Sequence, residues 1–179
     1  MTPAQLRGAR VTLRQWRNAD HAAFAQLNAD PVAMEFFPST LSPEESDAMV
    51  QRCHDAIAER GWGFWCLEIG GACAGFTGLN VPTFEAPFMP GVEIGWRLHP
   101  RYWGHGYATE AARLALDYGF GALRLQEIVS FTAVGNVRSR AVMERIGMRH
   151  DAAGDFDHPR LPPGHRLRRH VLYRLNAPS

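Results

Sequence analysis

A glycine-containing junction between a strand-like run and a helix-like run constrains this chain more than any other feature. The junction is the stretch 101–108, Arg-Tyr-Trp-Gly-His-Gly-Tyr-Ala, between the apolar run 92–98 and the amphipathic run 109–120. Gly104 and Gly106 leave backbone N–H groups uncovered where the helix is predicted to begin. Free amides at a helix N-terminus attract anions, and phosphates above all. The stretch therefore predicts a turn that binds a pyrophosphate or a similar group.

Two other glycine motifs that bind phosphates fit the stretch poorly. A dinucleotide-binding fingerprint requires G-x-G-x-x-G, and Thr109 occupies the position of its third glycine. A P-loop requires G-K-[ST], and no such sequence follows Gly106. The turn is therefore predicted to belong to neither motif.

The remaining segments predict a mixed α/β fold. Strands are predicted at 10–14, 64–69, 72–79, 92–98, 127–132 and 171–175, and helices at 20–28, 42–60 and 109–120. A last helix is predicted to follow Asn136 and Ser139 and to run through Ile146. Two of the strands flank Gly70-Gly71, which predicts a hairpin with adjacent antiparallel strands and with Cys73 opposite Glu68. Without a repeat or a linker, residues 1–179 are expected to form one domain, with helices on both faces of the sheet.

Local signals set several element ends. Ser42 and Glu45 form a capping box, with proline between them, and Gly61 ends the same helix. Asp20 is the expected N-cap of the first helix. Residues 155–164 are expected to be a loop.

Composition argues against several classes of function. The formal net charge of +1 gives no global attraction to nucleic acid or to a membrane surface, and no apolar run is long enough to span a bilayer. The N-terminus lacks the apolar core of a signal peptide. The three cysteines, Cys53, Cys66 and Cys73, and the four histidines between 150 and 170 have no metal-ligand spacing, so no metal is expected. Cysteine usage favours a reducing, cytoplasmic compartment.

The junction also carries a family resemblance. Residues 101–106 match the coenzyme-A signature Q/R-x-x-G-x-G/A of the GNAT superfamily of N-acetyltransferases. The flanking segments 93–98 and 107–111 follow the family's order. Residues 136–148 resemble the N-x-x-S…ExxGF segment of the ribosomal-protein N-terminal acetyltransferase branch, with Met148 in place of the usual Phe. The opening at 10–14 is similar to that branch as well, so the resemblance covers nearly the whole chain.

The resemblance implies a mostly antiparallel sheet that splays between its fourth and fifth strands, 92–98 and 127–132, with acetyl-coenzyme A wedged between them. The pyrophosphate is then expected on backbone amides of Trp103, Gly104, His105, Gly106, Tyr107 and Ala108, and pantetheine on backbone groups of Trp96, Arg97 and Leu98. Asn136, Ser139 and Met143 are further cofactor-binding candidates. Arg101 either adds a charged contact or is a solvated loop arginine.

The resemblance also implies transfer of an acetyl group to a primary amine, either a protein N-terminus or a small-molecule amine. Glu93 is the candidate base, or else a structural carboxylate of the strand. Ser139 either stabilises the leaving thiolate or caps a helix. Met143 occupies the position where many relatives have a tyrosine acid, which excludes that role here. No cysteine is placed for a covalent intermediate, so direct attack in a ternary complex is expected.

The acceptor side is predicted from an unusually aromatic connection at 34–38. Phe36, Phe37, Glu35 and His158 are candidate acceptor-binding residues, although the two rings could instead pack on the core. Two alternatives stay open. The chain could bind acyl-coenzyme A without turnover, or it could use another acyl group, such as succinyl, with the basic run 166–170 meeting its carboxylate. A monomer and a homodimer are both compatible with the sequence.

Overall fold

The structure, a computed structural model, describes residues 2–178 and contains one nine-stranded sheet. Its strand order is β1-β2-β3-β4-β5-β6-β9-β7, with β8 paired to β9. The bounds are β1 Leu6–Arg7, β2 Val11–Arg14, β3 Phe64–Ile69, β4 Ala72–Asn80, β5 Glu93–Leu98, β6 Glu127–Ala133, β7 Arg149–His150, β8 Phe156–Asp157 and β9 Arg169–Asn176. Every neighbouring pair is antiparallel except β5 and β6, which confirms the predicted mixed, mostly antiparallel sheet.

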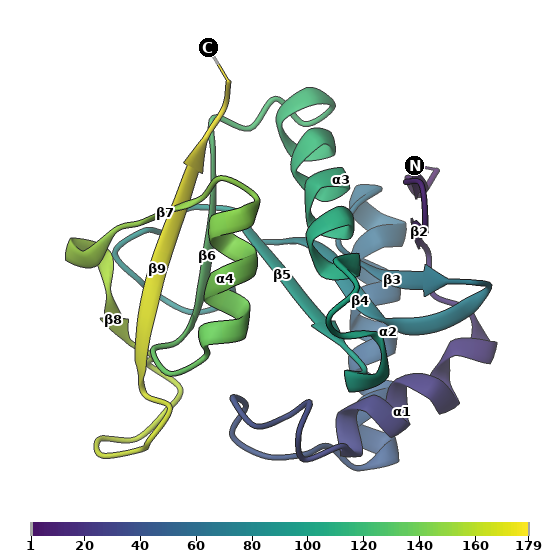
Figure 1. The fold of residues 1–179 in the computed structure, drawn as a ribbon, viewed down its shortest axis with the longest axis horizontal. Coiled ribbons are helices and arrows are strands. Elements are labelled where there is room, and N and C mark those ends of the chain that lie inside the picture. Colours follow the sequence, from purple (N-terminus) through teal and green to yellow (C-terminus); the bar gives the residue numbers. More distant parts are fainter. Residues whose placement is uncertain (1, 179) are drawn as a thin grey trace.

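The sheet splays open between β5 and β6. These two strands are in register at one position, Glu93 opposite Val129, where the Val129 N–H donates to the Val92 carbonyl at 3.0 Å. Beyond it the strands diverge, as Figure 1 shows. The predicted splay is therefore confirmed. The predicted fourth and fifth strands are β5 and β6, because the short β1 comes first.

The alternation of peptide groups along β5 decides which of them face the gap. The His99 N–H donates to the Ala74 carbonyl of β4, and the Arg97 carbonyl lies against Gly75 of β4. Peptide groups of successive strand residues point in opposite directions. Those of Trp96 and Leu98 therefore point into the opening between β5 and β6.

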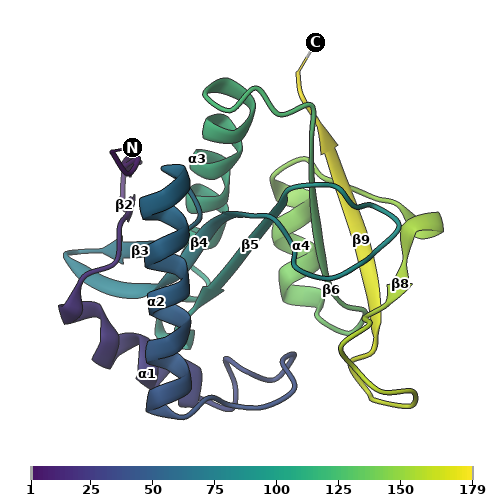
Figure 2. The same cartoon turned by 180° about the vertical axis from the view of Figure 1, so that it is seen from behind.

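Helices cover both faces of the sheet, as predicted. Their bounds are α1 His21–Ala29, α2 Pro43–Arg60, α3 Tyr107–Gly121 and α4 Val137–Arg145, with short 3-10 helices at Asn18–Asp20, Pro100–Tyr102 and Ala152–Gly154. α3 and α4 lie in front of the sheet in Figure 1, and α2 lies in front of it in Figure 2. Ala111, Ala112 and Ala115 are fully buried, so α3 packs closely on the strands. None of the helices within residues 2–178 has both the length and the hydropathy needed to cross a bilayer.

Local signals predicted α2 and the hairpin correctly. The Ser42 hydroxyl accepts a hydrogen bond from the Glu45 N–H, and the Glu45 carboxylate accepts one from the Ser42 N–H. Gly61 ends the helix with φ 83°. In the β3–β4 hairpin, Cys73 lies opposite Glu68.

Two local predictions were wrong. Asp20 does not cap α1 with its side chain, because its buried carboxylate accepts hydrogen bonds from both terminal nitrogens of Arg14, each at 2.8 Å. A buried carboxylate needs such a partner more than a helix end needs a cap. Residues 155–164 are not entirely loop, since Phe156–Asp157 forms β8. Phe156 packs with Leu172 and Val129 in a small apolar cluster, and this packing holds its segment against the sheet.

The fold brings together cysteines that the sequence spacing separates. The sulfur atoms of Cys66 and Cys73 and one carboxylate oxygen of Asp20 lie within 4.8 Å of one another, all buried. Both carboxylate oxygens of Asp20 are engaged by Arg14. The cysteines are free thiols.

A glycine in β4 allows the close approach of β5, and this gives a stability prediction. Gly75 has φ 144°, and a Cβ there would collide with the Arg97 carbonyl. We expect Gly75→Ala to lower the free energy of unfolding by more than about 3 kcal/mol, because strain and collision add. Urea denaturation measures the change. Gly70→Ala is the matched control, since Gly70 has φ 58° with nothing within 4 Å. It should cost about 1–2 kcal/mol, and equal losses in the two variants would contradict the close approach.

Candidate active site

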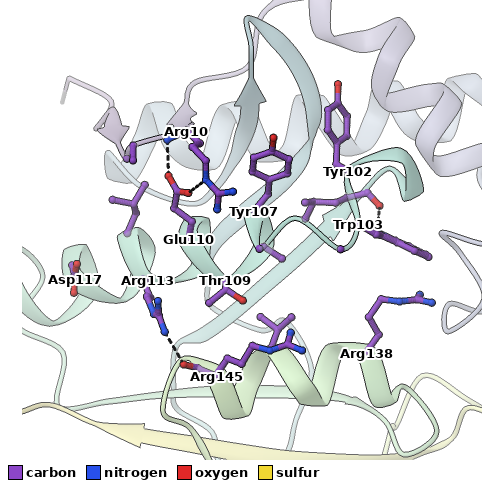
Figure 3. Close-up of a pocket in the computed structure, with 18 residues that line it drawn as sticks. Arg10, Tyr102, Trp103, Tyr107, Thr109, Glu110, Arg113, Asp117, Arg138 and Arg145 are labelled. Atoms are coloured by element: carbon purple, nitrogen blue, oxygen red, sulfur yellow. Dashed lines mark hydrogen bonds and ion pairs between the residues drawn. The ribbon is translucent and has the colours of Figure 1, made fainter.

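A cavity of about 820 Å³ lies between the glycine turn and α4. Figure 3 shows the turn and the start of α3 on one side of it and Arg138 and Arg145 of α4 on the other. We refer to it as the first cavity. Its lining residues are Gly8, Ala9, Arg10, Leu98, Tyr102, Trp103, Gly104, Gly106, Tyr107, Ala108, Thr109, Glu110, Arg113, Leu114, Asp117, Arg138, Val142 and Arg145.

The turn presents bare backbone to this cavity. Gly104 and Gly106 have φ values of 80° and 78°, which favour glycine. A Cβ added at Gly104 would meet no protein atom within 4 Å. The Glu110 N–H donates to the Gly106 carbonyl at 3.0 Å. The N–H groups of α3 that precede Glu110 therefore have no carbonyl within the helix to which they can donate. The geometry therefore suits an anion close to the backbone.

Arg10 holds the turn in place from the start of the chain. Its Nη1 donates to the His105 carbonyl at 2.8 Å. Its Nε donates to the Glu110 carboxylate at 2.7 Å, as Figure 3 shows. The same guanidinium lies 4.8 Å from the centre of the Tyr107 ring. Because Arg10 neutralises Glu110, the remaining charge of the lining is net positive, from three arginines against the single carboxylate of Asp117.

Those arginines come from α3 and α4. Arg113 donates to the Arg145 carbonyl at 3.0 Å, and Arg138 lies 3.7 Å from the centre of the Trp103 ring. The Trp103 indole N–H donates to the Leu98 carbonyl at 3.0 Å. Positive charge therefore surrounds an opening that begins at the free edge of β5.

A second cavity, of about 440 Å³, opens at the gap between β5 and β6. It shares Leu98, Trp103, Ala108, Arg138 and Val142 with the first cavity, so the two meet along a common wall. Its other lining residues are Val32, Ala33, Phe36, Phe37, Pro38, Met49, Phe64, Phe76, Glu93, Ile94, Gly95, Trp96, Arg97, Ser130, Phe131, Thr132, Asn136, Ser139, His158, Arg160, Leu161, Leu167 and His170.

Glu93 lines the second cavity, and the pKa of its carboxyl is raised. Burial raises the pKa of its carboxyl to about 7, and a hydrogen bond from the Asn80 amide opposes that rise. The Asn80 Nδ2 donates to the Glu93 Oε1 at 2.9 Å, which fixes the carboxylate. A carboxylate with a pKa near neutrality can accept a proton and release it again at physiological pH.

The start of α4 places a hydroxyl in the same cavity. The Asn136 side chain caps the helix, since its Oδ1 accepts from the Ser139 N–H at 3.2 Å. Its Nδ2 donates to the Thr132 hydroxyl at 2.9 Å, so both ends of the Asn136 amide are used within the protein. The Ser139 hydroxyl is not the cap, and Ser139 lines the second cavity.

The predicted acceptor-binding residues separate into two groups. Phe36, Phe37 and His158 line the second cavity. Burial, His170 and Arg160 lower the pKa of His158 to about 4, so its ring is neutral. Glu35 does not line this cavity. The residue is exposed, and its backbone carbonyl accepts a hydrogen bond from the Arg166 side chain at 2.8 Å.

The model of the acetyltransferase (GNAT) domain family matches residues 10–149. The chain belongs to the GNAT family. It is 44% identical, over 144 residues, to the uncharacterised N-acetyltransferase YnaD of Bacillus subtilis, covering 79% of this chain and 81% of that one. It is also 44% identical to the putative ribosomal N-acetyltransferase YdaF of Bacillus subtilis, over 55 residues that cover 31% and 30% of the two chains.

Solved structures share the fold. The structure of Mycobacterium smegmatis RimJ in complex with CoA-disulfide superposes with a TM-score of 0.78 at 25% identity, covering 98% of this chain and 88% of that chain. This GNAT protein is therefore an N-acetyltransferase enzyme with the fold that the resemblance implied. Family membership argues against an acyl-coenzyme A binding module without turnover.

Not all predicted cofactor-binding residues of this GNAT enzyme lie at the cavities. Arg101 is exposed with its guanidinium 5.0 Å from the Tyr102 ring centre, and His105 contributes its carbonyl to Arg10. Met143 is 1% exposed and packs in the core, so it lines neither cavity. The Arg97 backbone faces β4, and its side chain lines the second cavity instead.

Proposed function

We propose that the enzyme transfers an acetyl group from acetyl-coenzyme A to a primary amine by direct attack in a ternary complex. The observation that carries the proposal is the common wall of the two cavities at the splay of β5 and β6. One cavity suits a phosphorylated cofactor and the other contains Glu93 and Ser139. Both substrates can therefore be bound at once, on opposite sides of the transferring group.

The cofactor would extend from the first cavity, which would hold its phosphates, to the second cavity, which would hold its thioester. The pyrophosphate would lie on the amides of the turn from Trp103 to Ala108, with Arg138 and Arg145 supplying positive charge. The pantetheine arm carries amides like those of a strand, so it would extend β5 at the peptide groups of Trp96 and Leu98. The thioester would then reach the second cavity past Leu98 and Trp103, which line both.

The reaction needs a proton acceptor and a stabilised leaving group. An α-amino group has a pKa of roughly 7.7–8.0, so part of it is already neutral at pH 7. As the neutral nitrogen attacks, the N–C bond forms, the C–S bond breaks and the nitrogen loses a proton. Glu93 takes that proton, directly or through water. The Ser139 hydroxyl donates a hydrogen bond to the departing thiolate.

The acceptor would enter on the side of Phe36, Phe37 and His158. The segment 136–148 and the similarity to YdaF support membership of the ribosomal-protein N-terminal acetyltransferase branch, so the acceptor is a protein N-terminus or a small-molecule amine. We further propose that residues 1–179 form a single cytoplasmic domain that acts as a monomer or a homodimer. The three free cysteines accord with a reducing compartment.

Binding and turnover can be tested separately. Calorimetry with acetyl-coenzyme A tests cofactor binding, and release of the coenzyme-A thiol across a panel of amines and N-terminal peptides tests transfer. Absence of thiol release with every acceptor, despite cofactor binding, would refute the proposed function.

Replacing the proposed thiolate-stabilising hydroxyl gives a further prediction. Ser139→Ala is expected to lower kcat by about 10- to 100-fold, the effect of one hydrogen bond to a developing charge. The affinity for acetyl-coenzyme A should change little, because the ground-state thioester carries no such charge. Ser139→Thr retains a hydroxyl and should recover part of kcat. An unchanged kcat in Ser139→Ala would exclude the role.

A further inference from the structure

Arg97 brings a partly buried positive charge into the second cavity. Strand alternation puts Glu93, Gly95 and Arg97 on the same face of β5, the face toward α1 and α2, where Arg97 contacts Asn28 and Met49. A Cβ added at Gly95 would lie 3.2 Å from the Phe64 ring, so this ring packs over the strand between the two charged residues. Burial lowers the pKa of the Arg97 guanidinium to about 10, which leaves it charged at neutral pH.

Nothing with a negative charge satisfies this guanidinium among residues 2–178. Its Nη1 donates to the neutral Asn28 side-chain oxygen at 2.7 Å and lies 3.8 Å from the Met49 sulfur. The Phe37 ring centre lies 4.0 Å away and the Phe76 ring centre 5.4 Å away. Its Nε is buried without a hydrogen-bond partner in the described part of the chain. Buried charges are usually paired with a charge of the opposite sign, so a negatively charged ligand would supply the partner that this guanidinium lacks.

The other charges of the cavity do not supply a partner. Glu93 is the one carboxylate among the described lining residues. It lies four residues from Arg97, about 13 Å along an extended strand. Arg138 is stacked on Trp103, and Arg160 donates to Thr83, so both carry further positive charge at the cavity wall. The field in the cavity therefore favours an anion near Arg97.

We propose that Arg97 binds a carboxylate carried by the amine acceptor, so that the enzyme prefers amines that also bear a negative charge. The inference rests on the proposed function and adds the acceptor's chemical class. The Arg97 Nη2 has no hydrogen-bond partner among the described residues and, unlike Nε, is not enclosed by protein, so it can donate to a carboxylate oxygen. Asn28 holds Nη1 and so orients Nη2.

Matched acceptor pairs test the inference. Each pair is an amine with a free carboxylate and the same amine with that group as a neutral carboxamide: triglycine and triglycinamide, and ε-aminocaproate and its carboxamide. An extended triglycine spans about 10 Å, which is comparable with the separation of Glu93 and Arg97. Thiol release gives kcat/KM for each compound. We expect the carboxylate forms to be favoured by about 10- to 100-fold.

Two variants assign any such preference to Arg97. Arg97→Met keeps an unbranched stem but no charge, and it should reduce the ratio of kcat/KM values within each pair to about 1. Asn28→Asp retains Arg97 and nearly the same shape, but places a carboxylate on the guanidinium. It should abolish the ratio as well, which keeps the test valid if Arg97→Met unfolds. Thermal melting of each variant shows whether it is folded.

The outcomes separate the possible failures. Thiol release with equal rates for both members of every pair in the wild type would overturn the inference but leave the proposed function intact. A preference that survives in folded Arg97→Met and Asn28→Asp would also overturn it. A third arm compares acetyl- with succinyl-coenzyme A on triglycinamide. If Arg97→Met loses a preference for succinyl-coenzyme A there, the carboxylate belongs to the acyl group and the assignment to the acceptor is wrong.

Discussion

Gly104→Val is expected to abolish binding of acetyl-coenzyme A. No protein atom lies within 4 Å of a Cβ at this position, so the new side chain would project into the space assigned to the pyrophosphate. The backbone amides of the turn could then no longer approach the phosphate oxygens. The dissociation constant measured by calorimetry should rise more than about 100-fold, which corresponds to the loss of charge-assisted hydrogen bonds.

The chain offers a closely matched control for that variant. Gly164 has φ 82° and, like Gly104 with φ 80°, has nothing within 4 Å of an added Cβ. It lines neither cavity. Gly164→Val therefore imposes a similar backbone strain and should lower the melting temperature to a similar extent, yet leave cofactor affinity unchanged. Wild-type affinity in Gly104→Val would show that the turn does not hold the pyrophosphate.

Glu93→Gln is expected to lower kcat/KM by about 10²- to 10⁴-fold, the usual contribution of a general base. The base works when deprotonated, and burial raises the pKa of Glu93 to about 7. Wild-type activity should therefore rise with pH through about 7, as the carboxyl loses its proton. A second rise, near the amine's own pKa of roughly 8, belongs to the acceptor. Glu93→Gln should lack the first rise and keep the second.

Asn80→Ala provides the companion experiment to Glu93→Gln. The Asn80 hydrogen bond lowers the pKa of the Glu93 carboxyl, against the larger effect of burial. Its loss should raise that pKa further and move the first rise in activity to higher pH, while leaving the base in place. A pH profile of Glu93→Gln identical to that of the wild type would make Glu93 a structural carboxylate.

How far the sequence predicts this enzyme depends on the distance over which each contact acts. The α2 capping box and the strained glycines of the turn are local, since their partners lie within a few residues. Contacts such as those from Arg10 to His105 and from Asn80 to Glu93 join distant segments, and no local pattern indicates them. The site therefore has a predictable frame, whereas most of the partners that tune it become visible only in three dimensions.

Alternation along a strand decides which of the predicted site residues direct their backbone into the gap between β5 and β6. Arg97 was expected to contribute its backbone to the cofactor, as a neighbour of Trp96 and Leu98. Adjacent residues in a strand direct their peptide groups to opposite sides. The backbone of Arg97 therefore faces β4, whereas the backbones of Trp96 and Leu98 face the gap. Neighbouring residues of a helix also point in different directions. In α4, Met143 lies in the core, whereas Val142 lines both cavities.

The wall common to the two cavities has a consequence for inhibition. Leu98, Trp103, Ala108, Arg138 and Val142 border both spaces, so a single molecule can extend through the splay from one to the other. A conjugate that joins the sulfur of coenzyme A to an amine acceptor through a short linker would keep its second half at a high effective concentration once the first is bound. Such a conjugate should bind far more tightly than either half. Among conjugates that differ only in the amine portion, the tightest-binding one would indicate which amine the enzyme acetylates.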